Sequence, residues 1–125
     1  MISKKKVHIV LSSFGFWGEE LVAPMEEFDK AGITYDFSTP YGHPPEVVPV
    51  SMDPNYIDPP LQCKVTSPEM AAKVKRLVES NMLRSVKKVS DVKAGDYDAL
   101  LLVGGSGPLL DMNNAVPCTI LSGSL

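Results

Sequence analysis

The chain has 125 residues, of which 44% are hydrophobic and 22% are charged, a composition typical of one soluble globular domain. Its formal net charge of -3, with one short basic run at residues 4–6, argues against a nucleic-acid-binding protein. No apolar segment has the length of a membrane span or the pattern of a signal peptide, so we expect a cytoplasmic protein with no membrane partner.

The first predicted element is a buried strand, because residues 7–11 form a nearly continuous run of β-branched and apolar side chains. Apolar residues then recur at helical spacing over residues 17–31, and a basic last turn followed by Gly32 predicts where this helix ends. Residues 33–38 alternate apolar and polar side chains, as a second strand does. The order strand, helix, strand predicts a parallel unit and therefore an α/β fold.

A proline-rich segment follows, since seven of the eleven prolines lie within residues 40–60. This density argues against both a helix and a central strand. We expect a long loop, at least partly ordered, because too few residues follow to form another domain. Two interpretations remain open: the loop covers a site, or it is a surface excursion or an edge arm used in dimer contacts.

A second helix is predicted to begin at Ser67-Pro68-Glu69, with serine as the cap, proline at the first position and glutamate favoured by the helix dipole. Residues 86–94 form a charged connection, and residues 99–103 are the most apolar run and the next predicted strand. The expected apolar stripe of the second helix, with its methionines as core residues, consists of Met70, Val74, Leu77, Val78 and Met82.

The glycine cluster Gly104-Gly105-Ser106-Gly107-Pro108 follows that strand, at the position where open α/β sheets keep their ligand sites. It lacks the third glycine of a dinucleotide-binding motif and the lysine of a P-loop. Two interpretations remain. The cluster is a cradle of backbone amides for a carboxylate or an oxyanion, or it is a tight turn that needs glycine only for steric reasons.

Two acidic residues, Glu19 and Glu20, lie in the first turn of the first predicted helix, where the helix dipole alone favours them. Pro24 distinguishes Glu20 from its neighbour, because proline has no N–H to donate to the carbonyl of Glu20 and the helix should bend there. The start of this helix lies beside the carboxyl ends of the first and third strands, so we expect Glu20 to lie over the pocket.

The two cysteines, Cys63 and Cys118, have no neighbouring cysteine and no histidine at metal-ligand spacing. We therefore expect neither a disulfide framework nor a metal site. Lone thiols in a cytoplasmic chain are usually small buried side chains, and that is the expectation for both.

The segments FGFWGEELVAPMEEFDKAGITYDFSTP and DYDALLLVGGSGPLLDMNN together resemble the amino-terminal half of the DJ-1/PfpI (ThiJ) superfamily, specifically its Hsp31-like, class I glutamine amidotransferase-like branch. The resemblance runs from about Lys6 to Asn114, so residues 1–114 are family-like and residues 115–125 form an atypical tail. It implies a single truncated domain with a flavodoxin-like three-layer α/β fold and a mainly parallel sheet, its carboxyl-terminal part missing.

In that superfamily a reactive cysteine lies on a strained elbow between a strand and a helix, and a glutamate bonded to its sulfur lowers the thiol pKa. The resemblance implies this role for Glu20, with pocket amides at Gly104 and Gly105. The elbow would come after Asn114, but residues 115–125 have neither elbow glycines nor a histidine beside Cys118. We rank Cys118 low as a nucleophile, because nothing near it would lower its pKa. Catalytic roles are not expected for Cys63, His8 and His43.

The resemblance also implies a function, because full-length relatives are cysteine-dependent enzymes acting on small carbonyl compounds. Their glyoxalase III-type conversion of methylglyoxal to lactate needs no added cofactor, and they have stress-protective roles. Lacking the elbow, this chain is expected to be inactive. Three hypotheses follow: a truncated enzyme, a non-catalytic chaperone-like or binding module that self-associates, for instance as a homodimer, and a domain that binds small anions through the amides of residues 104–108.

Overall fold

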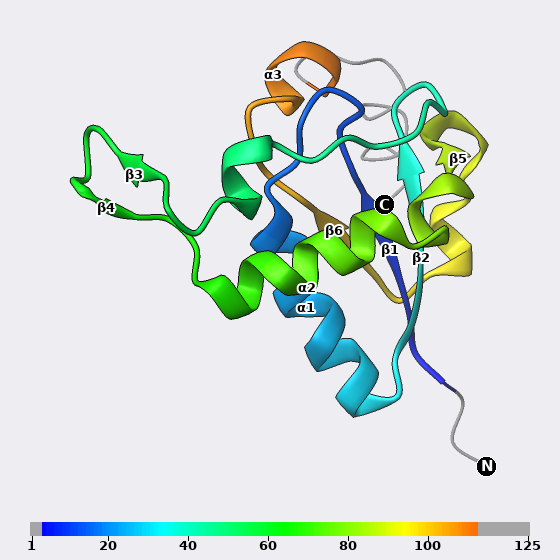
Figure 1. Ribbon diagram of the computed structural model, residues 1–125. Coiled ribbons are helices and arrows are strands. Elements are labelled where there is room, and N and C mark those ends of the chain that lie inside the picture. The colour runs from blue at the N-terminus through cyan, green and yellow to red at the C-terminus, as the bar shows by residue number, and fades with distance from the viewer. Residues whose placement is uncertain (1–3, 113–125) are drawn as a thin grey trace.

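The structure, a computed structural model, describes residues 4–112. At its centre lies a parallel sheet with the strand order β5–β2–β1–β6 (Figure 1). The strands are β1 (Lys6–Val10), β2 (Thr34–Thr39), β5 (Lys87–Lys88) and β6 (Ala99–Leu102). Helices lie on one face of this sheet, and short helical turns cover the other, so the predicted α/β class and flavodoxin-like arrangement are confirmed.

Helix α1 (Gly18–Ala31) follows β1 and begins one residue later than predicted, because Trp17 still has an extended backbone. It ends at Gly32, whose positive φ of 72° lets its N–H turn back to the last carbonyls of the helix, as predicted. Leu21 and Met25 on its inner side pack against the apolar side chains of the sheet. The order β1–α1–β2 therefore forms the expected parallel unit.

Helix α2 (Pro68–Glu79) packs beside α1, and Ser67 caps it as predicted by accepting a 3.0 Å hydrogen bond from the N–H of Met70. The predicted apolar stripe was wrong at its carboxyl end. Val78 is exposed, and Met82 is an exposed residue of the short helix η2 (Met82–Arg84) rather than part of the core. Met82 lies outside α2 because Ser80 ends the helix, with its hydroxyl and its N–H both bonded to the carbonyl of Leu77.

The proline-rich segment contains more regular structure than predicted, namely the 3-10 helix η1 (Pro49–Met52) and a hairpin of β3 (Ile57–Asp58) and β4 (Cys63–Lys64). Proline is compatible with η1 because Pro49 occupies its first position, where no N–H is needed. The hairpin projects from the body of the molecule (Figure 1). Two other parts of the segment contact the body: Val47 forms a parallel bridge with Phe16, and the buried Ser51 of η1 accepts a hydrogen bond from the N–H of Gly18.

The charged connection predicted over residues 86–94 contains the edge strand β5, which pairs with β2, and the short helix η3 (Val89–Asp91). Two adjacent exposed lysines form β5, and such lysines are common on edge strands because they discourage pairing with another chain. With η4 (Ala94–Asp96), this segment covers the second face of the sheet, where Val89 packs on Val10. No helix in the described part of the chain has the length and apolar character needed to cross a bilayer.

Candidate functional site

Two loops meet at the carboxyl ends of β1 and β6, where the site was predicted. The N–H of Trp17 donates to the carbonyl of Gly104 over 2.8 Å, and the N–H of Gly107 donates to the carbonyl of Gly15 over 2.9 Å. Gly105 has a φ of 139°, and a β-carbon there would lie 2.6 Å from the carbonyl oxygen of Gly15. The glycine cluster therefore has a steric requirement, since side chains would separate the loops.

The carboxyl group of Glu20 lies against Gly104. A β-carbon placed on Gly104 would lie 2.8 Å from Oε1 and 3.3 Å from Oε2 of Glu20, so any larger residue at 104 would displace this carboxyl group. Glu20 lies in the first turn of α1 with Pro24 one turn further on, as the sequence predicts. Its exposed side chain and the half-buried Gly104 leave this contact open to solvent.

Beside Glu20 the backbone offers hydrogen-bond donors. Within residues 4–112, the N–H groups of Gly104, Gly105 and Ser106 have no acceptor. The steric interpretation therefore applies to this loop, and the amide-cradle interpretation stays a prediction. A shallow groove of about 460 Å³ adjoins these amides, and it is lined by Leu102, Val103, Gly104, Gly105, Pro108, Leu109 and Met112.

The other candidate residues lie elsewhere. Cys63 is exposed, contrary to the expected burial, because β4 belongs to the projecting hairpin (Figure 1). His43 is exposed, and its backbone carbonyl accepts hydrogen bonds from the hydroxyls of Ser13 and Thr39. Cys118 lies outside the described residues. In the part that the structure describes, no group of three or more His, Cys, Asp or Glu side chains is placed to hold a metal ion.

His8 is buried in the sheet, with Nδ1 2.7 Å from Asp36 Oδ1 and Nε2 2.6 Å from Ser38 Oγ. Burial lowers the pKa of His8 and outweighs the opposing effect of Asp36. A neutral ring fits both bonds, donating from Nδ1 to the carboxylate and accepting the Ser38 hydroxyl at Nε2. The bond pattern is that of a Ser-His-Asp triad, but Ser38 is fully buried and out of reach of a substrate.

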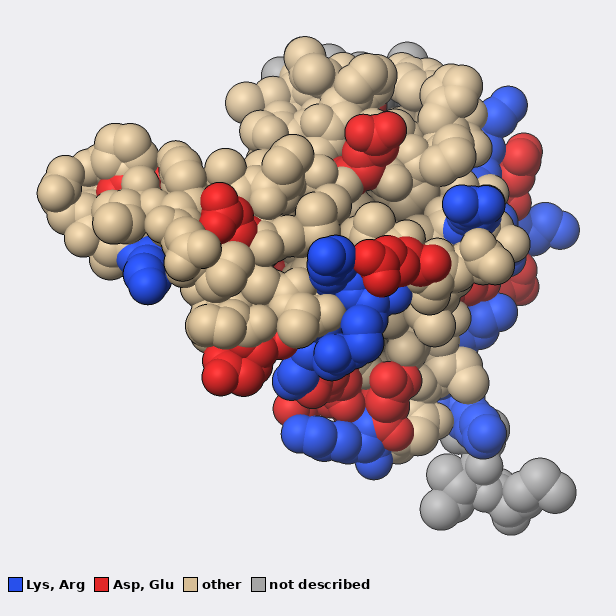
Figure 2. Space-filling model, viewed as in Figure 1, with Lys and Arg blue, Asp and Glu red and all other residues tan. Residues whose placement is uncertain are grey.

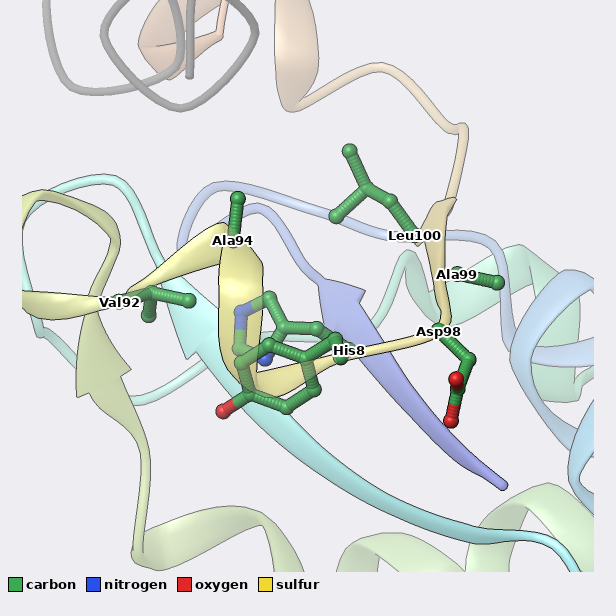
Figure 3. A pocket seen from close by; sticks show the side chains of 7 residues that line it. His8, Val92, Ala94, Asp98, Ala99 and Leu100 are labelled. Atoms are coloured by element: carbon green, nitrogen blue, oxygen red, sulfur yellow. The ribbon is translucent and has the colours of Figure 1, made fainter. Parts of the chain in front are cut away.

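Asp36 joins this buried group to the surface, because its Oδ2 accepts hydrogen bonds from the Tyr97 hydroxyl at 2.8 Å and from Lys87 Nζ at 3.2 Å. Burial alone would raise the pKa of Asp36, but the bonds from His8, Tyr97 and Lys87 together lower it. The ring centroid of Tyr97 lies 4.7 Å from that of His8. Both residues line a cavity of about 50 Å³, which Val92, Ala94 and Leu100 also line (Figure 3). Because this cavity holds little more than water, we assign the group a structural role.

The sequence analysis did not single out Asp111, which is buried at the end of the short helix α3 (Pro108–Asp111). Its carboxylate accepts hydrogen bonds from the Ser12 hydroxyl and from the N–H of Ser13, both at 2.8 Å. The sequence signal that could have identified Asp111 is an acidic residue one helical turn after Gly107, near the predicted pocket. That spacing alone does not show that the carboxyl group is buried.

Solved structures share the fold of this chain. A crystal structure of the protein APC35852 is 21% identical, with a TM-score of 0.70 over 98% of this chain and 52% of that chain. The X-ray structure of Francisella tularensis Rapid Encystment Protein 24 KDa is also 21% identical, with a TM-score of 0.64 over 90% of this chain and 50% of that one. The chain therefore spans about half the length of both. No curated protein matches it.

A family model described as ThiJ/PfpI family-like matches residues 11–125. This match covers both segments that carry the resemblance, residues 14–40 and residues 96–114, and it continues through residues 115–125. It does not separate the branches of the superfamily, so the Hsp31-like assignment stays a prediction. With the matching fold and the extent of this match, the chain belongs to the ThiJ/PfpI-like family of the DJ-1/PfpI superfamily.

Proposed function

We propose that this chain contributes part of a cysteine-dependent pocket for small carbonyl compounds, of the glyoxalase III type and without an added cofactor. The observation that supports this is the Glu20 carboxyl group against Gly104, in a loop whose N–H groups at residues 104–106 have no acceptor within the described residues. Backbone N–H groups stabilise negative charge that develops on a carbonyl oxygen. A carboxyl group beside a nucleophile can exchange a proton with it or with the substrate.

The nucleophile in this proposal is a cysteine outside residues 4–112. Within that range the only thiol is Cys63, which lies on the projecting hairpin rather than at the loops that hold Glu20. The chain spans about half of the structures it matches, and we propose that it carries a half-site that is inactive by itself. Reducing compartments keep thiols free of disulfides, so the proposal includes a cytoplasmic location. It also includes the stress-protective role that the resemblance to the family implies.

The first experiment is the intact mass of the protein isolated from its source cells. A mass near 13.6 kDa would show that the short form exists and would favour a non-catalytic role. If the mass is clearly larger, we expect Glu20→Gln in that protein to lower kcat/KM for methylglyoxal about 100-fold or more. Glu19→Gln is the matched control and should change it less than about threefold. Equal effects of the two substitutions would remove Glu20 from the mechanism.

The amides can be tested in the chain of 125 residues itself. Hydroxyacetone is a carbonyl probe much less reactive than methylglyoxal, and titrating it into the isotope-labelled protein should shift the amide resonances of Gly104 and Gly105 in a saturable way. The same protein should convert methylglyoxal no faster than buffer does. Unchanged Gly104 and Gly105 resonances at saturating probe would contradict the amide cradle.

A second candidate function is a chaperone-like or binding module that acts through self-association, for instance as a homodimer. In the described part of the chain β6 pairs only with β1, and no described strand covers its outer edge. Leu102, Leu109 and Leu110 are exposed next to it, and Figure 2 shows few charged side chains around α3. Open strand edges with apolar surroundings tend to pair with another chain.

Light scattering behind a sizing column tests this second candidate. We expect the wild type to elute with a mass of at least two chains at micromolar concentration, because association covers the edge of β6 that no other described strand pairs with. Leu109→Glu should shift it to one chain, because the new charge lies in the apolar surface. The control is Leu61→Glu on the hairpin, at a leucine that is similarly exposed. A monodisperse wild-type monomer would contradict self-association.

A further inference from the structure

Asp111 is the only acidic residue that is buried in the described part of the chain, with 2% of its surface exposed. Oδ1 accepts a hydrogen bond from the Ser12 hydroxyl and Oδ2 accepts one from the N–H of Ser13. The Ser12 oxygen in turn accepts the N–H of Phe14 over 2.9 Å. Within residues 4–112 no cationic side chain forms an ion pair with Asp111.

A buried carboxylate without a cation is costly unless well-placed donors satisfy it. Both donors here belong to the loop after β1, whereas Asp111 itself follows the glycine cluster after β6. The carboxylate therefore links the two loops that form the candidate site. Because it needs both donors at once, it favours one relative position of the loops.

The two loops are closely packed around this link. A β-carbon on Gly107 would lie 2.5 Å from the backbone nitrogen of Gly15 and would also collide with the Ser12 hydroxyl. The hydrogen bond from Trp17 to Gly104 adds a further contact at the start of α1. The position of Trp17 sets where α1 begins, and Glu20 lies in the first turn of that helix.

We propose that Asp111 is the positioning residue of this pocket: through Ser12 and Ser13 it holds the loop after β1 against residues 104–107, so that Glu20 lies over Gly104. The significance of this role for catalysis rests on the proposed function, whereas the positioning itself does not. Asp111 contacts no substrate and transfers no proton. An isosteric asparagine cannot replace it, because one amide N–H would face a donor.

The test is Asp111→Asn in the chain of 125 residues, with Asp91→Asn as the control. Asp91 is exposed and its carboxylate has no hydrogen bond or ion pair within the described residues, so both variants lose one negative charge but only one loses the link. NMR reports the contact between the Glu20 γ-protons and the Gly104 α-protons. Amide exchange of Trp17 and Gly107, compared with that of Ile9 in β1, reports opening of the loops.

We expect Asp111→Asn to abolish the contact from Glu20 to Gly104 and to speed exchange at Trp17 and Gly107 about tenfold or more, while exchange at Ile9 changes less than about threefold. Asp91→Asn should change none of these. An unchanged contact, or an equal increase at all three amides, would overturn positioning and leave only a general effect on stability.

If Asp111→Asn fails to fold, Ser12→Ala supplies a second test: it removes one hydrogen bond to the carboxylate, together with the one that the Ser12 oxygen accepts from Phe14, and leaves the charge and Ser13 in place. It should show the same pattern to a smaller extent. If the contact and the exchange rates at Trp17 and Gly107 stay unchanged in this variant, the proposal is overturned.

Titration with hydroxyacetone distinguishes the positioning role of Asp111 from the proposed function. If wild type does not bind the probe but the loops open in the variant, the proposed function fails and the positioning role stands. If wild type binds and the variant binds equally well, the positioning role fails.

Discussion

His8 is a polar residue in the middle of a strand whose pattern predicts burial on both faces. The parallel register places it beside Asp36, and Ser38 lies on the same face of β2 two residues later. Both ring nitrogens therefore find partners without leaving the sheet, as buried polar groups require. The sequence shows all three residues, but only the register shows that they meet.

This arrangement makes stability depend on pH. Because the pKa of His8 is below 6.5 in the folded state, the unfolded chain binds more protons as the pH falls below 6.5. The stabilisation is fully present above pH 6.5 and is lost as the pH falls toward the lowered pKa. The slope is at most about 1.4 kcal/mol per pH unit for one proton. Asp36, whose pKa is also lowered, adds a second loss only below about pH 3.8.

Urea unfolding at pH 5 to 8 measures this dependence. His8→Gln should remove most of the change between pH 5 and pH 6.5, at the cost of lower stability at pH 8 because Asp36 loses its buried partner. His43→Gln alters an exposed imidazole and should retain the wild-type dependence. A wild type equally stable at pH 5 and at pH 7.5 would contradict a neutral buried His8.

The contact between α1 and α2 depends on Gly18, the first residue of α1. A β-carbon there would lie 2.5 Å and 2.8 Å from the two γ-carbons of Val74, and 3.2 Å from the hydroxyl of Ser51. The N–H of Gly18 donates to that same hydroxyl over 3.1 Å. Glycine at this position therefore allows α1, α2 and η1 to meet, although a glycine is a poor helix former.

A double-mutant cycle tests this contact. Gly18→Ala should lower the free energy of unfolding by about 1–3 kcal/mol, because an added methyl group overpacks the junction. Val74→Ala alone leaves a cavity, but in the double variant it makes room for the new methyl group. The double variant should therefore be more stable than the sum of the single effects predicts, by at least about 0.5 kcal/mol. Additive effects in urea unfolding would mean that the helices move apart instead.

At the scale of the whole molecule, the apolar core and the exposed apolar surfaces are separate. The main cluster lies between the sheet and the helices α1 and α2, with Leu21 fully buried in it. The projecting hairpin carries exposed Ile57 and Leu61, and the edge at β6 carries exposed Leu109. Stability should therefore depend on the main cluster, and self-association on the edge at β6.

Identical substitutions test this division. Leu21→Ala should lower the free energy of unfolding by about 2–5 kcal/mol, because it leaves a cavity in the core. Leu61→Ala should change it by less than about 0.5 kcal/mol, because the side chain is 70% exposed. Unfolding in urea at low protein concentration measures both without a contribution from association. A large loss in Leu61→Ala would mean that the hairpin packs on the body.

Much of the fold was predictable from local patterns. The buried run of residues 7–11, the glycine after α1 and the cap at Ser67 located a strand and two helices, because these features act within a few residues. Local patterns did not predict β5, whose two lysines resemble a loop, or the hairpin of β3 and β4 within the prolines. Short strands are defined by their partners rather than by their own residues.

The same division holds for the site. The sequence by itself determined the class of the fold, the family and the candidates Glu20, Gly104 and Gly105, because a proline inside a helix and glycines after a strand leave a recognisable pattern. Only the tertiary structure decided that Glu20 lies against Gly104, that Asp111 links the two loops, and that Cys63 is exposed. These facts depend on contacts between residues far apart in the chain, and the register of the sheet brings those residues together.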